Sequence, residues 1–197
     1  MKKLVLVLLL AFPAAGALAG SGWEPQERIE YYDVWGSTGI ELYQSIGRNG
    51  PKLGSKRVIA YTDFKLLWSR DYRRQPDNSC RLTRASPSLT ITYRLPRVKG
   101  KLAPDVRRSW ERFAAGIEAH ERVHGEIILD MVRQIEAFST GLSVPDDPNC
   151  RKIRQVLEKQ LGALSQEQRR RSREFDGIEM SEGGNVRQLV LTLVNGP

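Results

Sequence analysis

Both histidines of this chain stand in one five-residue string, His120-Glu121-Arg122-Val123-His124, in which the two imidazoles are four positions apart. On an α-helix, residues four positions apart project about 40° from each other around the axis, so both rings would share one face. This geometry suits two ligands of one tetrahedral zinc ion, with the glutamate beside them to deprotonate a metal-activated water. We therefore expect His120 and His124 to bind Zn²⁺ and Glu121 to act as a general base. A pair of helical histidines without a metal is the alternative.

The residues around this string have the apolar spacing of a long helix. Across residues 105–138 apolar side chains recur every three or four positions, and the two histidines continue the same stripe. The rings should therefore face the protein body, where two polar groups need partners that a metal would supply. Pro104 and Asp105 mark the expected start, and Gly141 marks the stop. The stripe consists of Trp110, Phe113, Ile117, Ile128, Met131, Ile135 and Phe138.

The first 19 residues have the pattern of a secretory signal peptide. Two lysines precede a short apolar run, and Ala17-Leu18-Ala19 resembles the small-residue cleavage site of such peptides. The apolar run is too short for a membrane span, and no other segment is apolar enough to cross a bilayer. We expect residues 20–197 to form a single domain, secreted or periplasmic, monomeric, and without a transmembrane segment.

The chain is basic, with a formal net charge of +8. In an exported protein this charge favours contact with anionic envelope polymers. Nucleic acid is not expected as a partner outside the cytoplasm. The basic residues at 169–173 are expected to close a helix, because cations are favoured at a helix C-terminus.

Cys80 and Cys150 are the two cysteines of the chain. In an oxidising compartment an isolated pair of cysteines forms a disulfide, which we expect here. The long loop that it closes would contribute on the order of 4 kcal/mol in the chain-entropy model. Zinc ligation by the two thiolates is the alternative.

The remaining patterns predict an α+β fold. The sequence Thr38-x-x-Glu41 is a capping box that starts a short helix, and Asn49-Gly50-Pro51 ends it. The other expected elements are strands at 28–35, 58–68, 89–95 and 188–194, and a second helix at 150–171. We expect a small antiparallel or mixed sheet packed on the long helix with the histidines and on the second helix, in a zincin-like arrangement.

With these residues in view, the chain resembles the bacterial family described as predicted secreted zinc-dependent proteases (domain of unknown function 922). The resemblance covers nearly all of the mature chain and implies a zinc peptidase. Besides the histidine string and Cys150, it rests on Tyr32-Asp33-Val34-Trp35-Gly36-Ser37-Thr38, Glu41-Leu42, Gly50-Pro51, Thr62-Asp63-Phe64, Trp68, Cys80, Leu95-Pro96, Trp110 and Phe113.

The third zinc ligand is open, because a catalytic zinc usually has three protein ligands and the chain has two histidines. The family pattern has a tyrosine-aspartate pair followed by a T-x-H-G-like segment, and the matching residues 175–183 contain no histidine here. Glu182, next to the position of that histidine, is the first choice. Asp130 would face away from the histidines on the long helix and is discounted. The alternatives are Glu179 and Asp176 in the same segment, and Glu158 and Glu167 on the second helix.

The function that these residues predict is an exported zinc-dependent hydrolase, a peptidase acting on a peptide or protein substrate. Glu121 would take a proton from the zinc-activated water and return it to the leaving amine. An oxyanion stabiliser is not assigned. Two other functions stay open, a non-catalytic zinc-stabilised envelope binding protein and an amidase acting on cell-wall peptides. Candidate oxyanion donors are Tyr31, Tyr32, Tyr61 and Tyr93.

Overall fold

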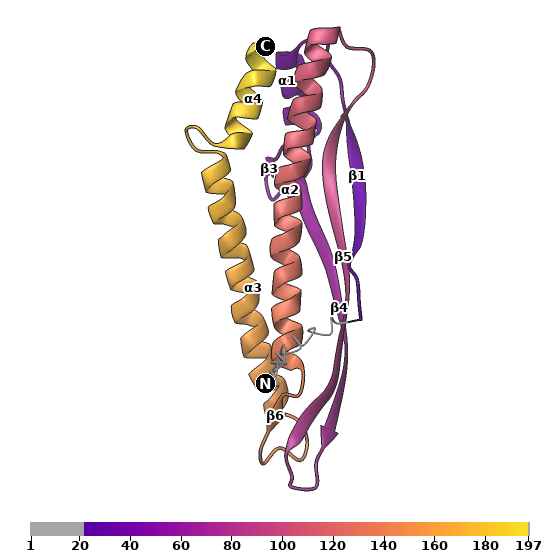
Figure 1. Cartoon of the computed structure of the whole chain (residues 1–197), viewed down its shortest axis with the longest axis vertical. Coiled ribbons are helices and arrows are strands. Elements are labelled where there is room, and N and C mark those ends of the chain that lie inside the picture. The colour runs from indigo at the N-terminus through magenta and orange to yellow at the C-terminus, as the bar shows by residue number, and fades with distance from the viewer. Residues whose placement is uncertain (1–21, 197) are drawn as a thin grey trace, which may run out of the picture.

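The computed structural model of this chain describes residues 22–196, so the expected signal peptide at residues 1–19 lies outside the described part. Figure 1 shows an elongated body in which the long helix α2 lies between the strands and helix α3. The described residues form a mixed sheet and four helices, which confirms the α+β class. Among these residues, no helix combines the length and hydropathy that a membrane span requires.

The main sheet is mixed because one of its pairings is parallel and the others are antiparallel. Its central strand is β5 (Cys80–Val98), with β1 (Gln26–Val34) parallel to it on one side and β4 (Tyr61–Arg74) antiparallel on the other. The short strand β6 (Ser143–Val144) pairs with the start of β5. The expected strand at 28–35 is confirmed as β1.

Strands β4 and β5 form a hairpin that is longer than the strands expected at 58–68 and 89–95. Alternate side chains of β5 are buried, as in a sheet with one face covered by helices. The hairpin continues past this region because Tyr72 and Leu82 pack into a second, smaller core around the disulfide. The buried side chains in the main part of β5 are Leu89, Ile91, Tyr93 and Leu95.

Helix α1 (Gly39–Asn49) begins where the capping box predicts. The hydroxyl of Thr38 accepts a hydrogen bond from the backbone N–H of Glu41 at 3.3 Å. The Glu41 carboxylate reaches back one residue further than in the ideal box and accepts from the backbone N–H and the hydroxyl of Ser37. A small separate hairpin follows, formed by β2 (Lys52–Leu53) and β3 (Lys56–Arg57).

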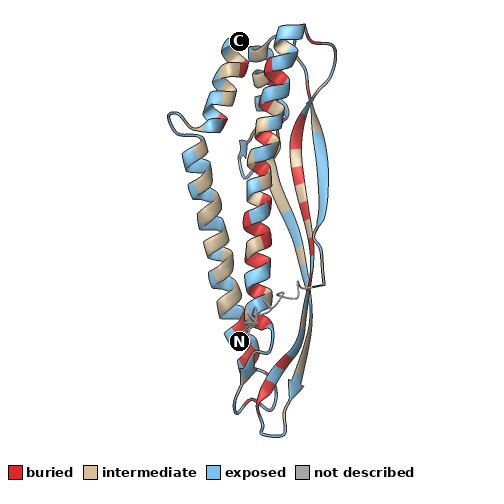
Figure 2. Cartoon of the chain, viewed as in Figure 1, coloured by how far each residue is buried: buried red, intermediate tan, exposed pale blue. Residues whose placement is uncertain are grey.

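Helix α2 (Pro104–Ser139) confirms the long helix expected at 105–138. Figure 2 shows buried residues recurring along the whole of α2, which packs against the sheet. Gly125 sets how closely helix and sheet approach each other. A Cβ atom at this position would stand 2.2 Å from the hydroxyl oxygen of Tyr93 on β5, so only glycine permits this contact.

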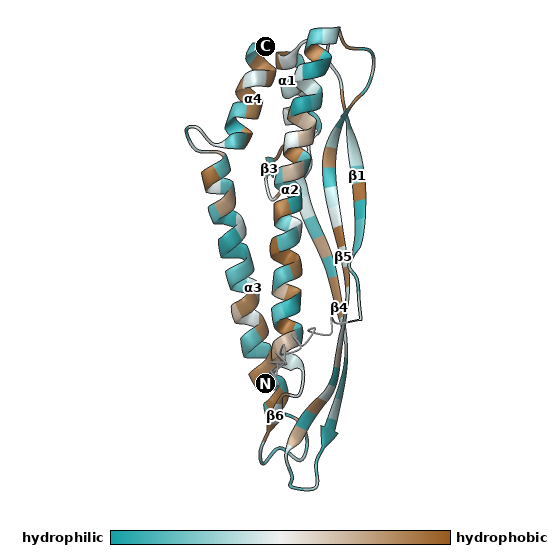
Figure 3. Ribbon diagram, viewed as in Figure 1, coloured by the Kyte–Doolittle hydropathy of each residue, from teal (hydrophilic) through white to brown (hydrophobic). Residues whose placement is uncertain are grey.

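Helix α3 (Lys152–Glu179) continues well beyond the expected end at residue 171. The basic run at 169–173 lies inside this helix and does not close it, so that prediction was wrong. The helix continues because these cations have acidic partners on its own surface and on α2. Figure 3 shows α3 as hydrophilic over much of its length. The ion pairs are Arg170 with Glu167 and Glu174, and Arg171 with Asp130.

The segment predicted as a terminal strand, residues 188–194, is part of helix α4 (Asn185–Asn195). Val186 and Leu193 are seven positions apart and both buried, and Leu189 between them packs against a glycine of α2. This is the period of one helix face, so the strand prediction was wrong. A short apolar run is compatible with either structure, and here the packing on α2 decides for the helix.

Cys80 and Cys150 form the predicted disulfide, with a sequence separation of 70 residues. It joins the first residue of β5 to the loop that precedes α3. In this oxidised state the two sulfurs are bonded to each other, so they are not thiolate ligands for zinc.

Candidate metal centre

His120 and His124 project from the middle of α2 toward α3. Their Nε2 atoms lie 3.2 Å apart, which is the proximity expected from the four-residue helical spacing. Their side chains are 9% and 12% exposed, so both rings face the protein body as predicted. The group that meets them comes from α3.

Asp176, in the last turn of α3, lies against both histidines. Its Oδ1 atom is 3.2 Å from Nε2 of His120 and 2.9 Å from Nε2 of His124. The two nitrogens and the oxygen thus form a triangle with edges of 3.2, 3.2 and 2.9 Å. In a tetrahedral zinc site with bonds of about 2.0–2.1 Å, donor atoms are about 3.3 Å apart. The three donors therefore fit three corners of such a site.

The other candidate carboxylates do not join this triangle. Glu182, the first choice from the sequence, is exposed in the turn after α3, outside the cluster of His120, His124 and Asp176. Glu158 and Glu167 precede Asp176 on α3 by 18 and 9 positions, which corresponds to roughly 27 and 13 Å along the axis. Because α3 extends to residue 179, Asp176 occupies a helix face turned to α2 and lies against the two histidines, where a loop carboxylate was expected. Glu179 approaches His120 from its other ring nitrogen.

His120 and Asp176 shift each other's pKa. Burial alone would lower the pKa of His120, but the hydrogen bond with Asp176 and the charges of Glu121 and Asp176 outweigh it and raise this pKa. Burial would raise the pKa of Asp176, yet the hydrogen bonds and charges of the two histidines prevail and lower it. The site thus favours a protonated His120 beside an ionised Asp176. Protons and a metal ion would compete for the same nitrogens.

Glu121 points toward the sheet, about 100° around α2 from His120. The residue is 5% exposed, and the hydroxyl of Thr62 on β4 donates to its Oε2 atom at 2.5 Å. The same hydroxyl oxygen is 3.1 Å from the backbone carbonyl oxygen of Glu121. Burial raises the pKa of Glu121 more than the Thr62 hydrogen bond and the two imidazoles lower it. A raised carboxyl pKa suits a group that accepts and releases a proton near neutral pH.

Sequence reasoning missed two residues that contact the site. Thr62, the partner of Glu121, appeared only as part of the family motif Thr62-Asp63-Phe64, without a role. Phe175 stacks on the ring of His120, with ring centroids 4.7 Å apart and planes inclined by 20°. It also meets the ring of His124 edge-on, at a centroid distance of 5.5 Å. The family pattern has an aromatic residue at this position, but only the structure shows that the Phe175 ring stacks on a histidine.

Two of the tyrosines considered as oxyanion donors, Tyr32 and Tyr93, make hydrogen bonds to other groups. The Tyr93 hydroxyl donates to Glu27 at 2.8 Å, and the Arg122 guanidinium lies over the Tyr93 ring. Burial, followed by the hydrogen bond with Glu27, raises the pKa of Tyr93 to about 12. The Tyr32 hydroxyl donates to a backbone carbonyl oxygen at 2.6 Å. Among the contacts of residues 22–196, none joins Tyr31, Tyr32, Tyr61 or Tyr93 to the two imidazoles.

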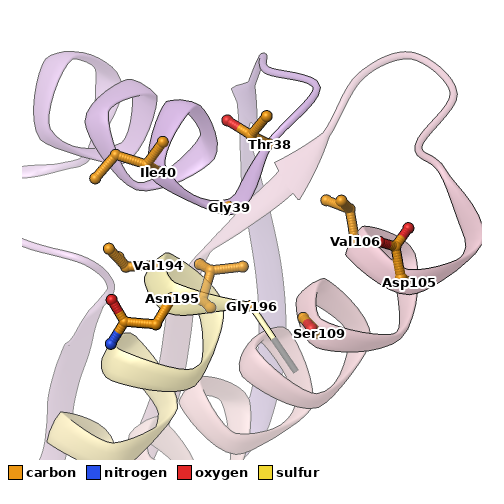
Figure 4. Close-up of a pocket in the computed structure, with 10 residues that line it drawn as sticks. Thr38, Gly39, Ile40, Asp105, Val106, Ser109, Val194, Asn195 and Gly196 are labelled. Carbon is orange, nitrogen blue, oxygen red and sulfur yellow. The ribbon is translucent and has the colours of Figure 1, made fainter.

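A cavity of about 220 Å³ lies elsewhere, where α1, the start of α2 and the end of α4 meet (Figure 4). Ser109 in its wall precedes His120 by 11 positions on α2, a rise of about 16 Å. The cavity is therefore separate from the histidine cluster. Its other walls come from Thr38, Gly39, Ile40, Asp105, Val106, Leu193, Val194, Asn195 and Gly196.

The family model described as "Bacterial protein of unknown function (DUF922)" matches residues 29–184. The matched region includes both histidines, Glu121 and Asp176, whereas α4 lies beyond it. No curated protein and no solved structure matches the chain.

Proposed function

The chain belongs to the DUF922 family of bacterial proteins of unknown function, and from its site we propose that it is an exported zinc-dependent hydrolase that cleaves peptide bonds. One observation carries the proposal. Two imidazole nitrogens of α2 and a carboxylate oxygen of α3 converge at spacings that suit three corners of a zinc tetrahedron. Three protein ligands with an open fourth position are typical of catalytic zinc and differ from the closed structural sites.

The chemistry follows from the groups around the donor triangle. A zinc ion held by His120, His124 and Asp176 would polarise a substrate carbonyl and lower the pKa of a water at the open position. Glu121 would serve as the general base that accepts a proton and later delivers it to the leaving amine. Thr62 orients the Glu121 carboxylate by its hydrogen bond, and Phe175 keeps the His120 ring in place by stacking.

The proposed setting is the periplasm or the cell exterior. The disulfide between Cys80 and Cys150 suits an oxidising compartment, as does the N-terminal sequence pattern. The proposed substrate is a peptide or protein, and the basic chain is expected to act as a monomer beside anionic envelope polymers.

A zinc-stabilised binding protein without turnover is the second candidate, and the way α3 packs favours it. The buried residues of α3 are Ile153 and Leu157, both near its start. Toward Asp176 the helix is held by polar contacts, among them the ion pair of Arg171 with Asp130. A metal that bridges α2 and α3 would fasten this half, which is the role of a structural zinc.

Metal content and hydrolysis together separate these functions. Wild type and Glu121→Gln should each bind one zinc per chain, and a variant with His120→Ala and His124→Ala should bind none. Glu121→Gln should hydrolyse casein or a peptide library about 10²- to 10⁴-fold more slowly, as expected for loss of a positioned base. Glu126→Gln, an exposed glutamate of the same helix, is the matched control and should keep wild-type activity.

Three outcomes would contradict the proposal. Full zinc occupancy without both histidines would exclude this metal centre. Equal activity of wild type and Glu121→Gln would remove Glu121 as the base. A wild type that binds zinc but hydrolyses neither peptides nor muropeptides would support the binding protein.

A further inference from the structure

The ring of His120 is enclosed on three sides, but one of its polar atoms has no hydrogen-bond partner. Its Nε2 atom faces Asp176, and its ring plane lies against Phe175. Its Nδ1 atom is buried and makes no hydrogen bond to any of residues 22–196. The carboxylate of Glu179 stands beside it, with Oε2 at 3.6 Å.

An imidazole that donates Nε2 to a metal must carry its proton on Nδ1. Metal-binding histidines almost always give that second proton to a carboxylate, a carbonyl oxygen or water, and this contact sets the tautomer and the ring orientation. The Nδ1 atom of His120 is too buried to rely on bulk water. The site therefore requires a protein acceptor at the position where Glu179 lies.

Glu179 is itself held in place. It is the last residue of α3, one helical turn after Asp176, and its side chain is 16% exposed. Its Oε2 atom accepts a hydrogen bond from the side-chain amide of Asn185, the first residue of α4, at 3.2 Å. The carboxylate is thus tied to the turn between α3 and α4. A shift of about 0.5 Å would bring it into ordinary hydrogen-bond distance of Nδ1.

We propose that Glu179 is the positioning residue of the metal centre, accepting the Nδ1 proton of His120 so that Nε2 is the atom presented beside Asp176. Asn185 supports it from α4. This inference rests on the proposed zinc function for its consequence, because the contact prepares His120 as a ligand. The same helical turn of α3 would then supply one metal donor, Asp176, and the acceptor that orients another.

The first measurement tests the contact without metal. In metal-free protein at a pH where His120 carries a proton on each ring nitrogen, Nε2–H faces Asp176, and Nδ1–H should give a downfield ¹H–¹⁵N NMR signal because Glu179 accepts it. Glu179→Met keeps the length of the side chain but removes the acceptor, and it should move the Nδ1–H signal upfield. Glu179→Gln retains an acceptor oxygen and should keep the signal close to that of wild type. An Nδ1–H signal that is the same in wild type and Glu179→Met would overturn the inference.

The second measurement tests the consequence for zinc, with affinity measured by competition with a chelator. Glu179→Met should weaken zinc binding about tenfold or more, and Glu179→Gln should recover most of the loss. Glu182→Met, which changes an exposed carboxylate three residues later, should bind as wild type. Wild-type affinity in Glu179→Met would refute the role of Glu179. If wild type itself binds no zinc, the proposed function fails, whereas the NMR signal of the Nδ1 proton still tests the contact with Glu179.

Discussion

At the scale of residues, α2 directs consecutive side chains to different partners. His120 and His124 face α3, where Asp176 is half exposed. Glu121 faces β4, where it is buried and accepts a hydrogen bond from Thr62. The proposed donors and the proposed base therefore stand in different surroundings although they are neighbours in the chain. Asp176 comes from α3, whereas the other two atoms of the triangle come from α2. The triangle therefore depends on how α3 packs against α2.

Replacing Asp176 should weaken the proposed zinc site. Asp176→Ala removes one of three donors, so we expect the zinc dissociation constant to rise at least tenfold, since even the loss of an orienting contact can have that effect. Glu182→Ala, the residue favoured by the sequence alone, is the control and should be unchanged. Titration against a competing chelator measures both. The opposite result, loss with Glu182→Ala and none with Asp176→Ala, would restore the loop ligand.

At the scale of elements, the close contact between α2 and the sheet sets the position of the histidine string. Tyr93 of β5 lies against Gly125, directly after His124, and the Arg122 guanidinium over the Tyr93 ring pairs with Glu27 of β1. These contacts fix the rotation of α2 about its axis and its position against the sheet. With α2 so placed, Glu121 meets β4 and the histidines are turned toward α3.

Gly125→Ala should push α2 away from the sheet, because the new Cβ would stand 2.2 Å from the Tyr93 hydroxyl oxygen. Overpacking of this kind lowers the free energy of unfolding by about 1–3 kcal/mol. Gly162→Ala in α3 is the matched control, since a Cβ there meets nothing within 4 Å, and it should gain about 0.5–1 kcal/mol. Urea unfolding measures both variants. Equal stability of Gly125→Ala and wild type would show that this contact is not tight.

At the scale of the whole molecule, the elongated body has two hydrophobic cores. The main core lies between the sheet, α2 and α4, and the smaller one surrounds Cys80 and Cys150. The disulfide ties the far end of the β4–β5 hairpin to the loop before α3. From Lys152 at the start of α3 to Asp176 the helix advances roughly 36 Å, so the disulfide lies far from the cluster of His120, His124 and Asp176.

Removing the disulfide should therefore lower stability without removing zinc. A variant with Cys80→Ser and Cys150→Ser loses a cross-link whose removal costs about 2–5 kcal/mol, which corresponds to a fall in melting temperature of about 5–15 °C for a domain of this size. Differential scanning calorimetry and zinc content, measured on the same preparation, test this. Loss of zinc in the folded variant would contradict the separation of the two sites and would favour thiolate ligands.

The sequence by itself determined the features that depend on local spacing. The four-residue separation of His120 and His124 places them on one helix face wherever that helix packs, and the apolar stripe of α2 requires that face to be covered. The capping box at Thr38 was predictable because it depends on a few neighbouring residues. The disulfide was predictable because two cysteines allow only one pairing.

Only the tertiary structure decided which distant groups meet those faces. Asp176 meets the two histidines because α3 continues to residue 179 and lies along α2. This depends on contacts such as Arg171 with Asp130 that no local pattern encodes. The helical state of residues 188–194 was decided by packing on α2, since a short apolar run suits a strand equally well. Thr62 meets Glu121 because the approach of α2 to the sheet brings them together. The spacing of apolar and polar side chains along an element shows which of its faces must be covered. The tertiary packing decides which distant element covers that face.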